Sequence, residues 1–304
     1  MKASTSLQSL WNVYGKALAL ILMMVIGALL PQFHIYTFLI QYLLMGMLFF
    51  AYLDVQVNPQ AFHRSVLWVL LANLAVAFLG YGLLARLDMN LALAAFITGI
   101  APTAISSSVI VSFIRGRVEY VALSVLLTNV SVALLLPFVL PLVAGTTVHI
   151  STWDMMRPVL VVMFVPLILA RLVRRLSPGV QAAVSRGKPL AFVLWLVNLF
   201  IVSANASHFV RSQVSDSLST LLEIALVSLV ICVVNFSLGA LIGGRRYWQE
   251  FSQALGQKNN SFAIWIALTF LSPLIAIGPT AYVLYHNLYN SFQIYLFERR
   301  RRGA

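Results

Sequence analysis

Long apolar runs follow one another along nearly the whole chain, and only short polar connections separate them. A transmembrane helix needs about 20 consecutive, mostly apolar residues. By that measure the chain contains ten spans, which leave little sequence for loops. They are predicted at residues 13–31, 35–53, 65–85, 91–114, 118–143, 155–175, 188–208, 219–242, 247–271 and 274–297. The pattern therefore predicts an all-α membrane protein of ten transmembrane helices, without room for a soluble catalytic domain.

Polar residues interrupt two of these spans. The fourth span contains Pro102 and then several hydroxyl residues up to Ser108, and the ninth contains the polar stretch Gly256–Asn260. Dividing the chain into residues 1–147 and 148–304 places one interruption at a matching position in each half. Because each half then has five spans, an odd number, the second half crosses the membrane in the opposite sense. Interrupted helices at matching positions of two inverted repeats mark the substrate site of many transporters, near the bilayer midplane.

The composition agrees with this interpretation, since 61% of the 304 residues are apolar and only 9% are charged. The net charge of +12 would suit a nucleic-acid partner, but the distribution of the basic residues argues otherwise. With both termini in the cytoplasm, sixteen basic residues lie on the inner side and three, Arg86, Arg157 and Arg211, on the outer side. This asymmetry predicts the cytoplasmic (inner) membrane, with anionic lipid headgroups as partners of the basic residues. Nothing in the sequence indicates a nucleic-acid partner or a particular oligomeric state.

Lys258 is the charged residue that this pattern places deepest inside a span. The eight acidic residues all lie in loops or near span ends, so no carboxylate is expected at the same depth. A charge near the bilayer centre costs roughly 2.5–3.5 kcal/mol on insertion scales, and such residues are commonly functional. Three arrangements would stabilise the group: loss of its proton, contact with the carbonyl ends of broken helices, or pairing with an anionic substrate. A fourth, in which the side chain reaches the interface, is disfavoured because about ten residues, roughly 15 Å of helix, separate it from either end of the span.

Other polar residues inside the predicted spans are candidates for the same site. His286 and Asn287 lie in the middle of the tenth span, and Ser124 and Thr128 are one helical turn apart in the fifth. Taken alone, such a histidine is more often a packing residue, and such hydroxyl groups usually bond along or between helices. We interpret the single Cys232, in the eighth span, as a buried apolar thiol.

Four segments resemble motifs of the bile acid:sodium symporter family, which also includes bacterial transporters of other organic anions. Residues 102–116, PTAISSSVIVSFIRG, resemble the family's P-G-G-T-A-S-N-x-x-x-Y-x-x-x-G. Residues 122–128, ALSVLLT, resemble the start of A-L-S-x-x-x-T-x-x-S, and residues 254–263, ALGQKNNSFA, resemble E-x-G-x-Q-N-S-G-x-A. Residues 279–287, PTAYVLYHN, resemble P-x-x-x-x-x-x-H-N. The order and spacing of these segments agree with the family along the whole chain.

The resemblance implies a panel domain of spans 1, 2, 6 and 7 against a core domain of spans 3–5 and 8–10, with the broken fourth and ninth helices crossing. It also shows where this chain departs from the family, because the sodium-coordinating glutamate falls on Ala254 and the sodium-coordinating glutamine on Lys258. A sodium ion about 4 Å from an ammonium would be repelled by roughly 4 kcal/mol even at an effective dielectric constant of 20. We therefore expect Lys258 to take the place of one sodium ion, and transport to be sodium-independent, coupled to protons or to no ion.

The sequence thus predicts a secondary transporter, not an enzyme, that moves a small organic anion by alternating access without a cofactor. The predicted substrate contacts are Ser107, Ser108, Asn259, Asn260, His286 and Asn287. The residues expected at the ion site or in coupling are Lys258, Ser107, Ser108, Ser124, Thr128, Ala254 and Gln257. Two alternatives stay open: a sodium-coupled symporter that uses the remaining hydroxyl groups, and a membrane sensor that binds the anion without transporting it. An arsenite-type exporter is disfavoured because the first broken helix has no cysteine.

Overall fold

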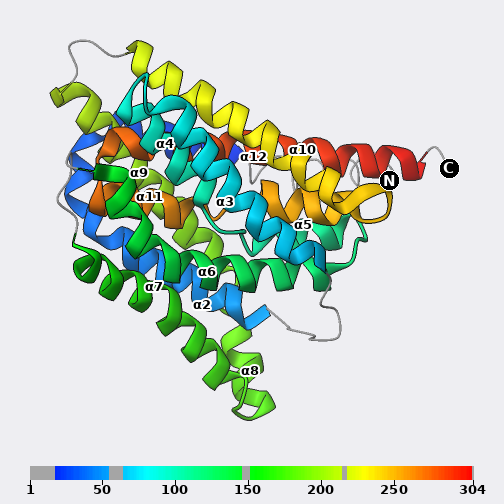
Figure 1. Ribbon diagram of the computed structural model, residues 1–304. Coiled ribbons are helices and arrows are strands. Elements are labelled where there is room, and N and C mark those ends of the chain that lie inside the picture. The colour runs from blue at the N-terminus through cyan, green and yellow to red at the C-terminus, as the bar shows by residue number, and fades with distance from the viewer. Residues whose placement is uncertain (1–17, 55–63, 146–150, 214–217, 303–304) are drawn as a thin grey trace.

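The computed structural model describes residues 18–54, 64–145, 151–213 and 218–302, and this part of the chain is almost entirely helical (Figure 1). It contains no β-strand, although two residues form an isolated antiparallel bridge. A first helical stretch, Leu18–Leu29, is followed by η1 (Pro31–Leu39), α2 (Ile40–Asp54), α3 (Arg64–Leu84), α4 (Met89–Ile100), α5 (Ser106–Phe113), α6 (Val118–Ala144), α7 (Thr152–Val173), α8 (Pro178–Ser185), α9 (Leu190–Gln213), α10 (Leu218–Gly256), α11 (Asn260–Phe270) and α12 (Pro273–Arg302).

Six of the described helical stretches are long and apolar enough to cross a membrane. They are Pro31–Leu53, Arg64–Leu84, Val118–Ala144, Thr152–Val173, Pro178–Phe209 and Ser219–Gly256. Helices α4 and α11 are apolar as well, but with 12 and 11 residues they have about half the length that a bilayer requires. The spans expected at 91–114 and 247–271 are therefore not continuous helices, because each is divided into two shorter helical pieces.

Both ends of helix α4 are well defined by the residues that flank it. At its start the Asp88 side chain accepts a hydrogen bond from the Leu91 amide at 2.9 Å, which satisfies one of the amides that a helix leaves unpaired. At its end the helix stops at Ile100, and the next residue, Ala101, has the non-helical backbone (φ −46°, ψ 130°) that a following proline, Pro102, favours. Residues 91–100 are all buried, so α4 lies inside the bundle on every side.

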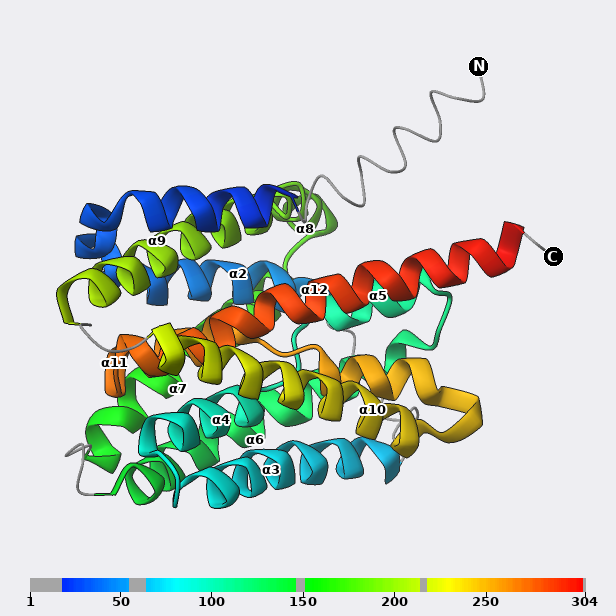
Figure 2. The ribbon, with the colours of Figure 1, turned by 90° about the horizontal axis from the view of Figure 1, so that it is seen from above.

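Helix α10 is a helical hairpin, not one straight rod. The backbone leaves helical geometry at Gly244 (φ 58°, ψ −159°) and again at Tyr247 (φ −129°, ψ 24°), and the chain then turns back along itself (Figure 2). The two arms pack closely because glycines of the first arm have no side chain. A Cβ atom on Gly243 would lie 2.9 Å from backbone atoms of Trp248. The predicted break between the spans 219–242 and 247–271 is thus present, and the second arm ends at Gly256, within the expected second interruption.

The helices form two sets of close neighbours. Helix α2 packs against α7 and α9, and η1 also packs against α9. Helices α4 and α10 pack against each other and each against α3 and α12, with α11 against α12 and α5 against α6. Figure 2 shows the first helical stretch, α9 and α2 along one side of the molecule and α3, α4 and α10 along the other. The segments that follow α4 and α10 meet between these sides.

Candidate functional site

The site is built where the two interruptions pair with each other. Thr103, between α4 and α5, and Lys258, between α10 and α11, form an antiparallel bridge. The Ala104 amide donates to the Gln257 carbonyl oxygen at 2.8 Å, and the Asn259 amide donates to the Pro102 carbonyl oxygen at 2.7 Å. These bonds satisfy backbone groups that would otherwise lack partners where the helices stop, which is the condition for irregular backbone inside a membrane protein.

Thr103, in the first interruption, forms hydrogen bonds with residues of both halves of the chain. Its amide donates to the Thr128 hydroxyl oxygen at 3.0 Å, and its carbonyl oxygen accepts from the Asn129 amide nitrogen at 2.9 Å. Its own hydroxyl donates to the Ala254 carbonyl oxygen at 2.6 Å. Thr103 thereby links α6, in the first half of the chain, to the last turn of α10, in the second half.

The Lys258 ammonium is held by oxygen atoms of the first half of the chain. Only 1% of this residue is exposed. Its Nζ donates to the Gly99 carbonyl oxygen at 3.0 Å and to the Asn73 side-chain oxygen. Gly99 is in the last turn of α4, where unpaired carbonyl groups carry the negative end of the helix dipole. Of the arrangements considered from the sequence, this is the contact with the carbonyl end of a broken helix; the side chain does not reach outward.

Asn73 completes this arrangement from α3. Its oxygen accepts from Lys258, and its amide nitrogen donates to the Ile100 carbonyl oxygen at 3.1 Å. A single buried carboxamide thus contacts both the ammonium and the end of α4. Asn73 is not among the residues predicted for the site, although it stands out as the one amide within the apolar run of α3.

A cavity of about 500 Å³ lies beside the paired interruptions. One part of its wall is apolar and comes mainly from α2 and α9, with Val283 of α12. Another part is polar and comes from the residues around the interruptions and from α12. The lining residues include Leu48, Ser106, Lys188, Phe192, Trp195, Lys258, Asn259, Asn260, Ser261, Val283 and His286. The cavity is large enough for a small organic molecule, and its wall offers both apolar contact and hydrogen-bonding groups.

Three of the predicted substrate contacts line this cavity. Asn260 and His286 are both buried, and the Asn260 amide nitrogen lies 3.2 Å from His286 Nδ1. Asn259 also lines the cavity and caps α11, because its side-chain oxygen accepts from the Phe262 amide at 3.3 Å. Asn287 is not among the lining residues; its side-chain amide donates to the Val283 carbonyl oxygen of its own helix at 2.7 Å.

Three of the four hydroxyl groups expected at the ion site donate hydrogen bonds to backbone carbonyl oxygens. Ser107, Ser124 and Thr128 each donate to a carbonyl oxygen of their own chain segment, at 2.5, 3.0 and 2.7 Å. Ser108 is half-buried, and its hydroxyl oxygen has no hydrogen-bond partner in the structure. None of these four residues lines the cavity. Gln257, in contrast, donates to the hydroxyl oxygen of the cavity-lining Ser106 at 2.6 Å.

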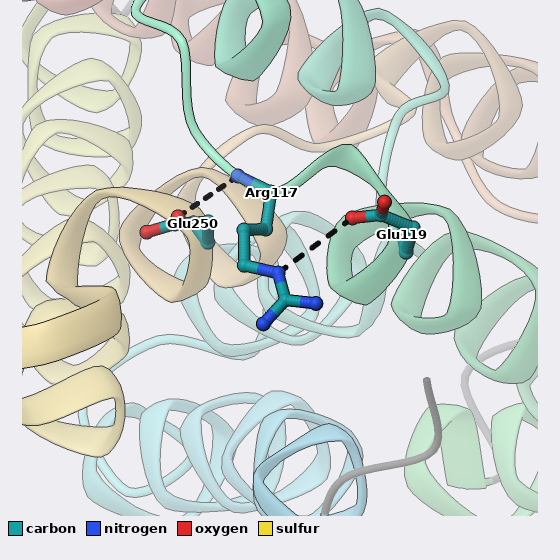
Figure 3. A network of polar contacts seen from close by, with 3 residues as sticks. All are labelled: Arg117, Glu119 and Glu250. Atoms are coloured by element: carbon teal, nitrogen blue, oxygen red, sulfur yellow. Dashed lines mark hydrogen bonds and ion pairs between the residues drawn. The ribbon is translucent and has the colours of Figure 1, made fainter. Parts of the chain in front are cut away.

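A second contact between the halves lies at the far end of α5 and is drawn in Figure 3. The Arg117 amide donates to Glu250 Oε1 at 3.0 Å, while the Arg117 side chain lies 4.0 Å from Glu119. Gly116 permits this approach, since a Cβ atom there would lie 3.1 Å from Glu250 Oε1. A side-chain hydrogen bond to Tyr247 raises the pKa of Arg117 above its ordinary value, so the guanidinium stays charged. Glu250 is buried and serves to hold the loop before α6 against α10.

The structure has the features of a membrane transporter: many apolar helices, two interrupted segments that pair with each other, and a cavity beside these segments. Residues 17–267 match the SBF-like CPA transporter family, and the chain belongs to this family. The match confirms the resemblance to the bile acid:sodium symporters and supports a transporter in place of an enzyme.

The chain is also similar to a Bacillus subtilis (strain 168) protein named "Uncharacterized protein YbaS", to which it is 25% identical over 208 residues. The matched region covers 66% of this chain and 66% of the relative.

Proposed function

We propose that this protein is a secondary transporter of a small organic anion, and that it works by alternating access. The proposed architecture is two inverted repeats, residues 1–147 and 148–304, with a panel domain of spans 1, 2, 6 and 7 against a core domain of spans 3–5 and 8–10. The packing of α2 with α7 and α9, and of α4 and α10 with α3 and α12, supports this division. The cavity is lined from both sets of helices, as a substrate site between two moving bodies requires.

The proposed orientation has both termini on the cytoplasmic side of the inner membrane. It rests on the sixteen-to-three distribution of basic residues between the two sides. The turn between α8 and α9, which contains Arg186 and Lys188, is then cytoplasmic. Lys188 and Phe192 line the cavity, so in the proposed orientation the cavity would open toward the cytoplasm.

The observation that carries the proposal is the position of the Lys258 ammonium. It occupies the junction of the two interruptions and lies against the carbonyl end of α4, at the position where the resemblance places a sodium-coordinating glutamine. The charge of an ammonium at Lys258 would repel a sodium ion bound beside it, which disfavours the sodium-coupled alternative. We therefore propose transport without sodium, with a proton as the coupling ion or with no coupling.

Transport by purified protein in proteoliposomes tests this proposal. We expect uptake of radiolabelled organic acids at the same rate in sodium as in choline buffer, and the comparison is repeated with an imposed pH gradient. A steep dependence on sodium would contradict the assignment of Lys258. Binding of an organic acid without any flux would instead favour the sensor alternative.

A further inference from the structure

A buried chain of side-chain amides leads from the helix bundle to the wall of the cavity. Gln253, in the second arm of α10, and Asn290, in α12, are both buried, and the Gln253 amide nitrogen donates to the Asn290 side-chain oxygen at 2.9 Å. The Asn290 amide nitrogen donates in turn to the Gln257 side-chain oxygen at 3.1 Å. The Gln257 amide nitrogen then donates to the Ser106 hydroxyl oxygen at 2.6 Å. Because Ser106 lines the cavity, the chain of hydrogen bonds ends at the space where a ligand would bind.

The hydrogen bonds of this chain all run in the same direction, toward the cavity. An amide donates through its nitrogen and accepts through its oxygen, so the orientation of one amide fixes that of the next. In the last bond the Gln257 nitrogen supplies the hydrogen, and Ser106 is the acceptor. The hydrogen of the Ser106 hydroxyl is therefore left over. Ser106 is exposed, and within the described residues its hydroxyl donates to no other group, so this hydrogen is available in the cavity.

Gln253 fixes the direction of the chain. Both hydrogens of its amide nitrogen have acceptors, the Asn290 side-chain oxygen and, at 2.7 Å, the Gln293 side-chain oxygen. Gln293 in turn donates to the Tyr289 hydroxyl oxygen at 3.3 Å. The atom of this network that is buried without a partner is Gln253 Oε1, an acceptor. Buried acceptors that lack a partner are tolerated more often than buried N–H groups that lack one, which favours the observed direction.

The wall of the cavity beside Ser106 is apolar. Ile105 precedes Ser106, Val109 follows one turn later in α5, and both line the cavity. A hydroxyl donor among apolar groups distinguishes strongly between ligands, because a ligand without an acceptor leaves the donor unpaired when it displaces water. Ser106 was not among the substrate contacts predicted from the sequence.

We propose that Ser106 donates a hydrogen bond to the molecule bound in the cavity, and that Gln253, Asn290 and Gln257 are the positioning residues that hold it in this role. Ser106 thereby selects a substrate that carries an acceptor oxygen, such as a carbonyl oxygen, at the start of α5. The inference rests on the proposed function, since it concerns the substrate of the same cavity, but it does not require the substrate to be charged.

A matched pair of uncharged probes tests Ser106 without requiring flux. The probes are 2-acetylnaphthalene and 2-isopropenylnaphthalene, which have nearly the same shape and differ by the replacement of the carbonyl oxygen with a CH₂ group. Thermal stabilisation of the purified protein at increasing probe concentrations gives the two affinities. We expect Ser106→Ala to weaken binding of the ketone by roughly 3- to 10-fold and to leave the hydrocarbon unchanged, whereas Ser106→Thr keeps the hydroxyl group and the affinity.

The matched control is Ser112→Ala, which removes a hydroxyl group from the same helix at a residue outside the lining. The Ser112 hydroxyl donates to the Val109 carbonyl oxygen at 2.7 Å, so its loss should not change the affinity for either probe. Asn290→Leu tests the positioning role. It removes the group that orients Gln257, whose oxygen can then accept the Ser106 hydrogen, and we expect an intermediate loss of affinity for the ketone alone.

Three results would overturn the assignment of Ser106. They are a wild-type protein that the ketone stabilises no more than the hydrocarbon, an equal loss for both probes in Ser106→Ala, and an equal loss for the ketone in Ser106→Ala and Ser112→Ala. Unchanged binding in Asn290→Leu would refute the positioning role. Absence of flux in proteoliposomes, with the expected binding pattern intact, defeats the proposed transport and leaves Ser106 as the donor. Flux with no effect of Ser106→Ala on binding refutes the donor role and leaves the transport function.

Discussion

Lys258 shows how one buried charge can be tolerated at the junction of two broken helices. An isolated ammonium at the bilayer centre is unfavourable, but here it meets the carbonyl end of α4 at Gly99 and a carboxamide oxygen of Asn73. The helix end gains as well, because buried carbonyl groups without a partner are costly. The side chain therefore bonds to the carbonyl end of α4, and in the proposed function it also supplies a positive charge beside the cavity.

Replacement of Lys258 tests this dual role at the level of one side chain. Lys258→Met removes both the charge and the hydrogen bond to Gly99, so we expect a loss of roughly 1–3 kcal/mol in stability and loss of uptake. Lys258→Gln keeps a donor without the charge, and we expect it to recover part of the stability but not the uptake. Chemical denaturation in detergent and uptake in proteoliposomes measure the two effects. Normal uptake by Lys258→Met would contradict the proposed role.

At the scale of elements, the polar interruptions could be predicted and their partners could not. Pro102 and the stretch from Gly256 to Asn260 indicated where the helices break, because a proline and a run of amides are unfavourable within an apolar helix. The pairing of Lys258 with Asn73 depends on how α3 lies beside α4, across 185 residues of sequence, and no local pattern encodes it. Ser107, Ser108 and Asn287 were expected at the cavity from the resemblance, but their orientation on their helices places them outside its lining.

The hairpin of α10 gives a test at this scale. A Cβ atom on Gly239 would lie 2.8 Å from Ser252 Cα and 2.9 Å from the Phe251 carbonyl carbon, and these backbone atoms cannot move without separating the arms. We expect Gly239→Ala to destabilise the protein by roughly 1–3 kcal/mol, as overpacking usually does. The control is Gly82→Ala in α3, where no atom lies within 4 Å of the added Cβ and alanine favours the helix. Similar melting temperatures for the two variants would refute the close packing of the arms.

At the scale of the whole molecule, the sequence indicated an all-helical membrane transporter and its family, and both are confirmed. These properties follow from composition and from motifs that are local in sequence. The cavity between α2, α9 and α12 is a property of three-dimensional packing, so Lys188 and Trp195 were not identified as lining residues in advance. Lys188 was seen only as one of the basic residues that set the orientation.

The side to which the cavity opens can be measured with a single reactive thiol. Cys232 is buried and is the one cysteine of the chain, so Lys188→Cys adds an accessible thiol at the edge of the cavity. We expect a membrane-impermeant maleimide to label this variant in inside-out vesicles and not in right-side-out vesicles. Trp153→Cys, at the exposed start of α7, is the matched control and should show the reverse. Labelling of Lys188→Cys in right-side-out vesicles alone would contradict the proposed orientation.

An ammonium that belongs to the chain cannot dissociate, and this has an energetic consequence for the proposed cycle. A sodium ion that travels with an anion compensates its charge, whereas Lys258 returns with the empty protein after every turnover. If no proton accompanies the substrate, each monoanion then carries one uncompensated negative charge across the bilayer. A membrane potential of 100 mV, negative inside, favours its exit by about 2.3 kcal/mol. The covalent attachment of one cation would thus convert a scaffold suited to accumulation into a voltage-driven route for the release of organic acids.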